Sequence, residues 1–343
     1  MRAKGINYDT GFLRGGTFSR ERFDPDVVRR ELRVIRDDLH CTAVRVIGGD
    51  PERLELAAAS AADLGLEVWF SPYPLELTRR EMLELFADCA ARAERQRQRQ
   101  RGAEVVFVTG AELSLMNKGF LPGAAQEDRL RLLLDQRDRL HERVGEISAH
   151  VNSFLAEAVA VVREHFAGKI TYASIPLERI DWAPFDFVSV DLYRSAEVAD
   201  QFSEGVRTLV AQGKPVAITE FGTATYHGAG DLGGRCMEIA EYDSRTGAPV
   251  RLNDAFTRDE AGQAAYLREL LEVFDTHGVD STFAFLFALH SFPHRPDGDP
   301  RDDLDLASPG IVKVLEHGRG NAYPDMPWEP KTAFTALADS YSA

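Results

Sequence analysis

The chain of 343 residues is poor in cysteine, with Cys41, Cys89 and Cys236 alone. Their number is odd and their spacing is wide, so the sequence offers neither a disulfide framework nor a zinc-binding pattern. No apolar run approaches the roughly 20 residues that a membrane-spanning helix needs. The first residues, from Met1 to Lys4, do not lead into the apolar core of a signal peptide. We therefore expect reduced thiols, no membrane contact and a cytoplasmic location.

Positive charge is also scarce, because 40 lysines and arginines stand against 55 aspartates and glutamates, for a formal net charge of −15. Nucleic-acid binding needs a basic surface, so this balance argues against it. The sequence carries no phosphate loop and no Gly-x-Gly-x-x-Gly motif directly after an apolar run. The acidic stretch 297–305 lacks the spacing of an EF-hand. We expect no nucleic-acid partner, no cofactor and no metal.

Short apolar runs alternate with longer amphipathic stretches from end to end of the chain. The apolar runs, read as strands buried on both faces, cover residues 4–8, 42–47, 66–70, 104–109, 169–173, 187–192, 215–219 and 282–289. The expected helices cover residues 24–39, 51–64, 78–101, 126–166, 195–212, 259–276 and 331–340. Eight such repeats predict an α/β fold, a (β/α)8 TIM barrel, with residues 1–343 as a single domain.

Three segments of this pattern are unusually long. As one unbroken helix, 126–166 would reach roughly 60 Å, more than the height of a barrel. We therefore expect a break near Gly145 or a protruding helical hairpin. The loops 222–256 and 291–327 follow strands seven and eight. Long loops in compact domains are usually functional, and these two would lie on the C-terminal face, where barrel active sites are found.

Two glutamates follow apolar runs at this expected rim. Glu112 closes the segment VFVTGAE (106–112), and Glu220 closes the segment VAITE (216–220). Strands four and seven face each other across a barrel mouth, so the two carboxylates can meet over a bound ligand. Such a pair suits cleavage of a glycosidic bond, in which one carboxyl group protonates the leaving oxygen and the other attacks the anomeric carbon.

The pattern resembles the clan A glycoside hydrolases, which are retaining enzymes on this barrel. The resemblance rests on the segment TEFG (219–222), on Arg45 within VRV at strand two, and on Tyr193 at the end of strand six. It implies that Glu112 is the acid/base and Glu220 the nucleophile. It also implies that Arg45 and Tyr193 lie beside the nucleophile.

Two positions depart from that family. The family usually has an asparagine before the acid/base, which binds the sugar 2-hydroxyl; here the residue is Ala111, and Asn117 is a candidate replacement. The family commonly has a tryptophan at the end of strand eight, where this chain offers Phe287 or His290. These differences are equally compatible with a changed substrate.

A second resemblance concerns the segment EFGTATYHGA (220–229), which is similar to uncharacterised actinobacterial proteins, some of them labelled abortive-infection proteins. Nothing in the chemistry of these residues implies phage defence.

Further side chains are expected to contact the substrate because they end strands or follow the nucleophile. Strand-end capping, core packing and loop packing are the competing interpretations for them. The expected substrate-binding residues are Arg45, Asn7, Tyr8, Asp9, Trp69, Asn117, Tyr193, Tyr226, His227 and His290.

The sequence thus predicts a retaining glycoside hydrolase acting on a small glycoside or oligosaccharide. A carboxyl separation of about 5–5.5 Å would agree with retention, and one of roughly 9 Å with inversion. One alternative is a lyase, isomerase or specialised-metabolite enzyme that uses the same carboxylates. Another is a catalytically silent barrel with a binding or defence role. Assembly into a homo-oligomer is left open.

Overall fold

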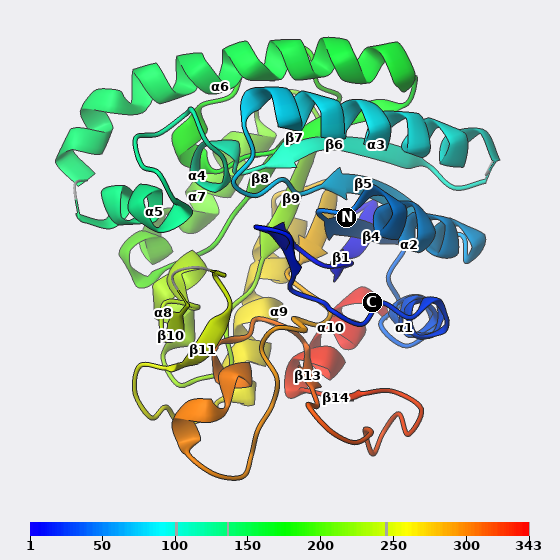
Figure 1. The fold of residues 1–343 in the computed structure, drawn as a ribbon, viewed down its shortest axis with the longest axis vertical. Helices are drawn as coiled ribbons and strands as arrows, with labels where there is room; N and C mark the ends of the chain where they lie inside the picture. Colours follow the sequence, from blue (N-terminus) through cyan, green and yellow to red (C-terminus); the bar gives the residue numbers. More distant parts are fainter. Residues whose placement is uncertain (100–101, 136, 244–245, 343) are drawn as a thin grey trace.

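The structure is a computed structural model that describes residues 1–99, 102–135, 137–243 and 246–342. Eight parallel strands form its central sheet, in the order β7-β6-β5-β4-β1-β12-β9-β8 (Figure 1). Their bounds are Ala3–Asp9 for β1, Ala43–Gly48 for β4, Glu67–Pro72 for β5, Val105–Ala111 for β6, Lys169–Ala173 for β7, Val188–Asp191 for β8, Val216–Phe221 for β9 and Ser281–Ala284 for β12.

The two edge strands of this sheet, β7 and β8, meet and close it into a barrel. Ser174 forms a parallel bridge with Val190, and the amide of Asp191 donates to the carbonyl of Ser174 at 2.8 Å. The hydroxyl groups of Thr171 and Ser189 add a hydrogen bond of 2.6 Å inside the seam. The predicted (β/α)8 barrel is therefore confirmed.

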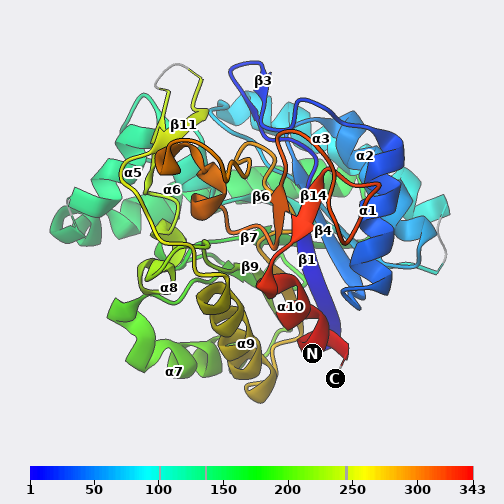
Figure 2. The same cartoon turned by 90° about the horizontal axis from the view of Figure 1, so that it is seen from below.

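Helices surround the strands on all sides (Figure 2). They are α1 (Pro25–Asp37), α2 (Pro51–Asp63), α3 (Arg79–Arg99), α6 (Arg137–His165), α7 (Ala199–Val210), α9 (Glu260–Thr276) and α10 (Thr332–Ser342). Their starts follow ordinary capping chemistry. The carboxylates of Asp24 and Asp50 cap α1 and α2, each followed by proline, and the side chains of Thr78 and Glu81 each bond the other's backbone amide.

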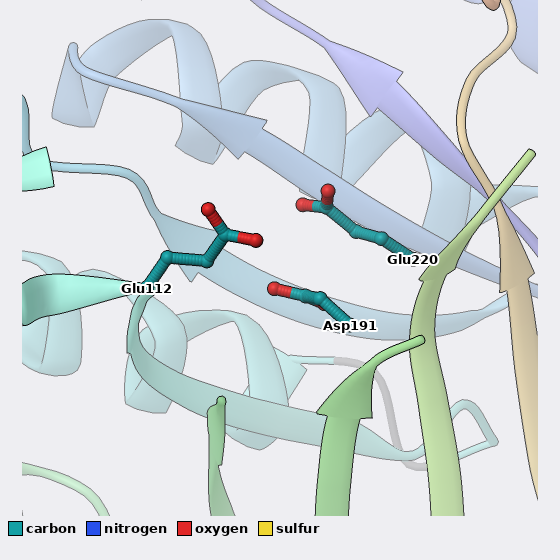
Figure 3. A group of neighbouring side chains, drawn as sticks. All are labelled: Glu112, Asp191 and Glu220. Carbon is teal, nitrogen blue, oxygen red and sulfur yellow. The ribbon is translucent and has the colours of Figure 1, made fainter. Parts of the chain in front are cut away.

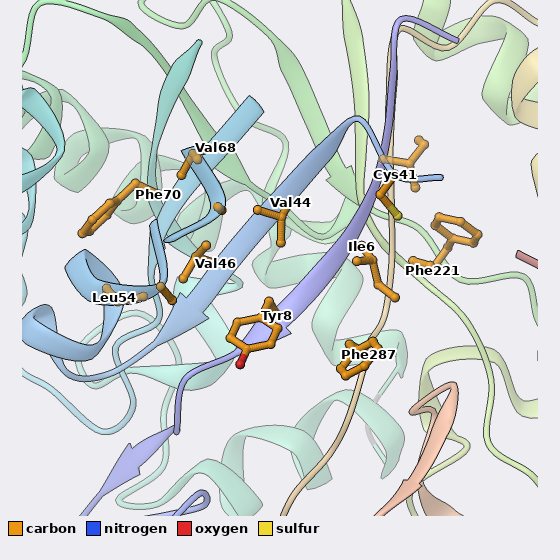
Figure 4. Packing of buried hydrophobic residues seen from close by; sticks show 14 of the residues in the cluster. Ile6, Tyr8, Cys41, Val44, Val46, Leu54, Val68, Phe70, Phe221 and Phe287 are labelled. Atoms are coloured by element: carbon orange, nitrogen blue, oxygen red, sulfur yellow. The ribbon is translucent and has the colours of Figure 1, made fainter. Parts of the chain in front are cut away.

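The core has two layers, separated by the strands. Outside the barrel, alternate strand residues pack against the helices, including Ile6, Val44, Val46, Val68 and Phe70 (Figure 4). Inside, Trp69 packs between Phe187 and Phe283, with ring centroids 4.9 and 4.7 Å away. This aromatic cluster fills the barrel interior below the rim, and the cavity that contains the carboxylates lies above it, at the C-terminal end of the strands.

The long loops after strands seven and eight are present, as predicted, and they contain small elements of their own. The first carries α8 (Ala229–Leu232) and a hairpin of β10 (Ala240–Tyr242) and β11 (Pro249–Leu252). The second carries β13 (Val312–Val314), which pairs with β14 (Trp328–Pro330). An additional hairpin, β2 (Leu13–Arg14) with β3 (Thr17–Phe18), follows β1 and was not predicted.

Two predicted element boundaries are wrong. Strand eight ends at Ala284 rather than at 289. The register with β9 shifts between Thr282 and Ala284, and beyond this point the amides of Phe285 and Phe287 still donate to the carbonyls of Phe221 and Asn7, at 2.8 and 3.0 Å. The break expected near Gly145 is wrong, because Gly145 lies inside α6; the tract 126–166 contains two helices in contact, α5 (Gln126–Asp135) and α6, which is compatible with the alternative of a helical hairpin. Helix α6 lies alongside α3, and α5 takes a different direction (Figure 1).

No helix within the described residues is both long and apolar enough to span a membrane.

Candidate active site

Glu220 lies near the end of β9 and is only 3% exposed. Arg45, on β4, donates from Nη1 to its Oε1 at 2.9 Å. The hydroxyl group of Tyr193, just beyond β8, donates to its Oε2 at 3.0 Å. Both carboxylate oxygens therefore accept a hydrogen bond, one of them from a cation, which fixes the direction of the group and favours its ionised form.

Arg45 is itself fully buried and held by several acceptors. Its Nη1 also donates to the Asn7 side chain at 3.2 Å and to the Thr219 carbonyl at 3.1 Å, and its Nε donates to the Ser71 hydroxyl at 3.1 Å. Asn7 in turn donates to the Thr219 carbonyl at 2.9 Å. Asn7 thus acts on Glu220 through Arg45, beneath the floor of the site.

Glu112 follows β6 and begins the short helix α4 (Leu113–Met116). Its backbone is left-handed, with φ 44° and ψ 41°, a conformation that costs free energy in a non-glycine residue. Its own amide donates to the carbonyl of Ala173 at 2.9 Å, which ties it to β7. The amide of Leu113 donates to the hydroxyl of Tyr172 at 2.8 Å.

A buried carboxylate completes this support for Glu112. Glu178 accepts from the amide of Ser114 at 3.0 Å and from the hydroxyl of Tyr172 at 2.7 Å. Tyr172 and Glu178 therefore hold the first two amides of α4, the residues directly after Glu112. We call this pair the α4 brace. It fixes the turn that points Glu112 towards Glu220.

Three carboxylates, not two, meet at the rim: Glu112, Glu220 and Asp191, the last residue of β8 (Figure 3). One oxygen from each lies within 4.8 Å of the others. Asp191 is 2% exposed, and Arg45 Nη1 lies 3.8 Å from its Oδ1. Such a spacing is compatible with binding a cation, but Arg45 already supplies a positive charge to the group. The donor set does not identify a metal.

Burial raises the pKa of Glu112 well above its usual value, and the charges of Asp191 and Glu220 raise it further. Burial also raises the pKa of Glu220, but the charge of Arg45 and the hydrogen bonds from Tyr193 and Arg45 oppose that rise. The pKa of Glu112 is therefore raised more strongly than that of Glu220, which is the order that an acid and a nucleophile require.

These carboxylates open into a cavity of about 1500 Å³. Phe12, Tyr73 and Phe285 form an aromatic part of its wall, and Phe12 packs edge-on against Tyr73 at 5.1 Å. His290 also lines it; burial and the charge of Arg20 hold the pKa of His290 well below its usual value, so this ring is neutral. The volume exceeds the roughly 300–1,000 Å³ of ordinary small-molecule pockets.

Tyr8 and Asp9, expected at the pocket floor, do not line this cavity. The Tyr8 side chain points outward (Figure 4), donates to Glu31 at 2.5 Å and accepts from Arg20 at 3.1 Å. Asp9 is buried and accepts from the amide of Gly11 at 2.7 Å; burial raises its pKa to about 6. Alternation along β1 explains Tyr8, because successive side chains face opposite sides of a strand.

Trp69 and Asn117 are also placed away from the cavity. Trp69 belongs to the aromatic cluster, and its indole nitrogen donates to Glu67 at 2.7 Å. Asn117 is fully buried and bonds the backbone of Leu77 and Pro74, at 3.2 and 3.0 Å. Asn117 thus joins two loops. It does not reach the cavity, so it does not replace the asparagine that the family has at the position of Ala111.

The two residues expected in the loop after Glu220 are likewise not among the cavity residues. Tyr226 is buried against Phe256, with ring centroids 5.1 Å apart. His227 is largely exposed and lies 3.6 Å from Asp259.

Among the cavity residues that the sequence did not single out, Asp191 and Phe285 bear most on the site. Asp191 is the last residue of β8, but the predicted strand 187–192 contains it, so it did not stand out as a residue of the rim. Phe285 occupies the end of strand eight, where Phe287 or His290 was expected; Phe287 instead packs against Trp328 in the core, at 5.2 Å.

Comparison with known proteins gives a result for the fold. No protein-family model matches the sequence, and no curated protein matches it either. A solved GH113 beta-1,4-mannanase matches with a TM-score of 0.61 and 14% identity, over 99% of both chains. The two chains share the (β/α)8-barrel fold.

Other solved structures agree with that assignment. An endo-beta-1,4-mannanase from Thermotoga petrophila matches with a TM-score of 0.52 and 11% identity, over 100% of this chain and 76% of the mannanase. A glycoside hydrolase family 5 enzyme from Prevotella bryantii B14 matches with a TM-score of 0.53 and 10% identity, over 99% and 96%. At such identities the likeness concerns the fold alone.

Proposed function

We propose that the protein is a retaining glycoside hydrolase. The observation that carries this proposal is the pairing of a buried, hydrogen-bonded Glu220 with a Glu112 whose pKa is strongly raised, across one cavity. Their oxygens approach within 4.8 Å, nearer to the spacing of retaining enzymes than to the roughly 6.5–9.5 Å of inverting ones.

The proposed reaction has two steps. In the first, Glu220 forms a bond to the anomeric carbon while the bond to the leaving oxygen breaks, and Glu112 transfers its proton to that oxygen. In the second, the Glu112 carboxylate takes a proton from water, the water oxygen bonds to the anomeric carbon, and Glu220 is released. Arg45 and Tyr193 orient Glu220 and stabilise it as an anion when it leaves.

The substrate is proposed to be a small glycoside or an oligosaccharide. The volume of the cavity is sufficient for more than one sugar unit. The aromatic rings of Phe12, Tyr73 and Phe285 line it and can pack against the apolar face of a sugar. A pocket too narrow for a pyranose would have favoured a lyase or isomerase instead. A cavity of about 1500 Å³ gives that alternative no support.

We also propose that the protein works in a reducing compartment, as a cytoplasmic enzyme would. Cys41, Cys89 and Cys236 are all buried free thiols. Burial raises the pKa of Cys236 to about 11, so this thiol is unreactive.

Hydrolysis of aryl glycosides by the wild type and by Glu220→Gln tests the proposed function. The wild type should release the aryl group from at least one member of a panel of gluco-, manno- and galacto-configured glycosides in both anomeric forms. Glu220→Gln should lower kcat by a factor on the order of 10³ or more, since the nucleophile is gone. Glu272→Gln, on the exposed side of α9, is the matched control and should keep full activity. A panel left intact by the wild type, or a Glu220→Gln variant as active as the wild type, would refute the proposal.

A further inference from the structure

Asp191 is the member of the three-carboxylate group that the proposed reaction does not use. It is 2% exposed and lines the cavity, yet neither oxygen accepts a hydrogen bond of regular geometry from the described residues. The nearest cation, Arg45 Nη1, is 3.8 Å away and already donates to Glu220 at 2.9 Å. A buried carboxylate without donors is costly, so a site that retains one is built for a ligand that brings them.

The charges around Asp191 define what that ligand must supply. Within the described part of the chain, the ion pairs of Glu220 and Asp191 are both with Arg45. One guanidinium therefore faces two carboxylates in a site largely shielded from water. Burial and the charge of Glu220 raise the pKa of Asp191 well above its usual value, so a cationic partner is needed to keep this carboxyl group ionised. A neutral donor would satisfy the oxygens of Asp191 but would leave the negative charge uncompensated, whereas a cationic donor satisfies both.

The position of Asp191 defines where on the sugar this donor lies. In the proposed reaction Glu112 and Glu220 flank the anomeric carbon, and an Asp191 oxygen lies within 4.8 Å of an oxygen from each (Figure 3). The anomeric carbon has two ring neighbours, the ring oxygen and C2. The ring oxygen has no hydrogen to donate to a carboxylate, so the substituent on C2 is the group that Asp191 can bind.

We propose that Asp191 binds a protonated amino group on C2 of the glycon, so that the enzyme prefers 2-amino-2-deoxy glycosides with a free amine. This inference rests on the proposed function for the placement of the sugar. Ala111, directly before Glu112, has no polar atom with which to compete for the C2 substituent. Asp191 contributes to substrate selection, and Glu112 and Glu220 carry the bond cleavage.

Calorimetric binding of methyl glycosides tests this assignment without requiring hydrolysis. The probes are methyl 2-amino-2-deoxy-glucoside and -mannoside and their 2-hydroxy counterparts, at a pH where the amine is protonated. The wild type should bind an amino glycoside at least about tenfold more tightly than the matching hydroxy glycoside, as expected for a hydrogen bond between charged groups. Asp191→Asn should lose that preference, so that it binds the amino and the hydroxy glycoside with similar affinities. Asp200→Asn, an exposed position in α7, is the control and should retain the preference.

The outcomes separate this inference from the proposed function. Equal wild-type affinity for amino and hydroxy glycosides overturns the inference, and that comparison does not depend on how well any variant folds. A preference that survives in Asp191→Asn also overturns it. If amino glycosides bind through Asp191 but no aryl glycoside is cleaved, the proposed function fails and the site assignment stands. If hydroxy glycosides are cleaved through Glu220 without any amine preference, the proposed function stands and the assignment of Asp191 to a C2 amine fails.

Discussion

At the scale of single residues, the site contains three carboxyl groups whose surroundings differ. Glu220 receives hydrogen bonds on both oxygens, Glu112 receives the repulsion of its neighbours, and Asp191 receives neither support nor full solvent. The sequence placed Glu112 and Glu220 at strand ends, since each follows an apolar run, but it left Asp191 inside the predicted strand 187–192. It could not show which oxygen each donor reaches, because that depends on contacts between strands far apart in the chain.

The charge of Asp191 should be visible in the pH dependence of the reaction. Glu112 acts as an acid, so activity should fall as the pH rises through its raised pKa. Removing a neighbouring negative charge lowers that pKa, so Asp191→Asn should move the alkaline limb of kcat/KM to lower pH, by about one unit. The measurement is kcat/KM against pH on an aryl 2-hydroxy glycoside. An alkaline limb that stays in place, or moves to higher pH, would contradict the assignment of Glu112 as the acid.

Several side chains predicted at the residue scale lie elsewhere for one physical reason. Tyr8 and Trp69 come from apolar strands whose ends could be located from the sequence, but the face on which each side chain lies could not. In a barrel strand both faces are buried, so the apolar pattern does not distinguish the interior from the helix-facing side. The positions of Arg45 and Tyr193 were predicted correctly, because the resemblance to clan A glycoside hydrolases implied that both residues lie beside Glu220.

At the scale of elements, the left-handed turn at Glu112 and the α4 brace together position the Glu112 side chain. Sequence periodicity located β6 well but not α4, which is four residues long. The brace comes from Tyr172 on β7 and Glu178 beyond it, more than fifty residues away along the chain. Long-range hydrogen bonds of this kind leave no periodic signal, so the support of the acid could not have been predicted.

The brace should matter most when the leaving group needs a proton. Tyr172→Phe removes the hydroxyl that accepts from the amide of Leu113, so Glu112 should lose its fixed position. We expect kcat to fall on the order of tenfold for poor leaving groups and to change little for dinitrophenyl glycosides, which need no acid. Tyr323→Phe, which removes a surface hydroxyl bonded to Asp38, is the control. An equal loss for both kinds of leaving group would assign Tyr172 a general structural role instead.

At the scale of the whole molecule, the two long loops are joined beneath the rim. Lys331, just before α10, is buried and pairs with Asp305 of the second loop at 2.9 Å. It also donates to the hydroxyl of Thr225 in the first loop at 2.9 Å. Loop length correctly predicted their position over the site. The internal hairpins and this buried ion pair could not be predicted, because irregular segments lack a repeating pattern.

The barrel itself was the most predictable feature, because eight buried parallel strands and their helices each carry a local signal. Its closure depends on Ser174 and Val190, which no local pattern marks. The formal net charge of −15 is a property of the whole chain and did not indicate that Arg45 pairs with both Glu220 and Asp191.

The stereochemistry of the first-formed product tests the central claim most directly. An aryl glycoside that the wild type cleaves can be followed by proton NMR during the first minutes, before the free sugar mutarotates. Double displacement through Glu220 predicts that the released sugar first appears with the anomeric configuration of the substrate. Initial release of the opposite anomer would contradict the assignment of Glu220 as a nucleophile and of Glu112 as its acid/base.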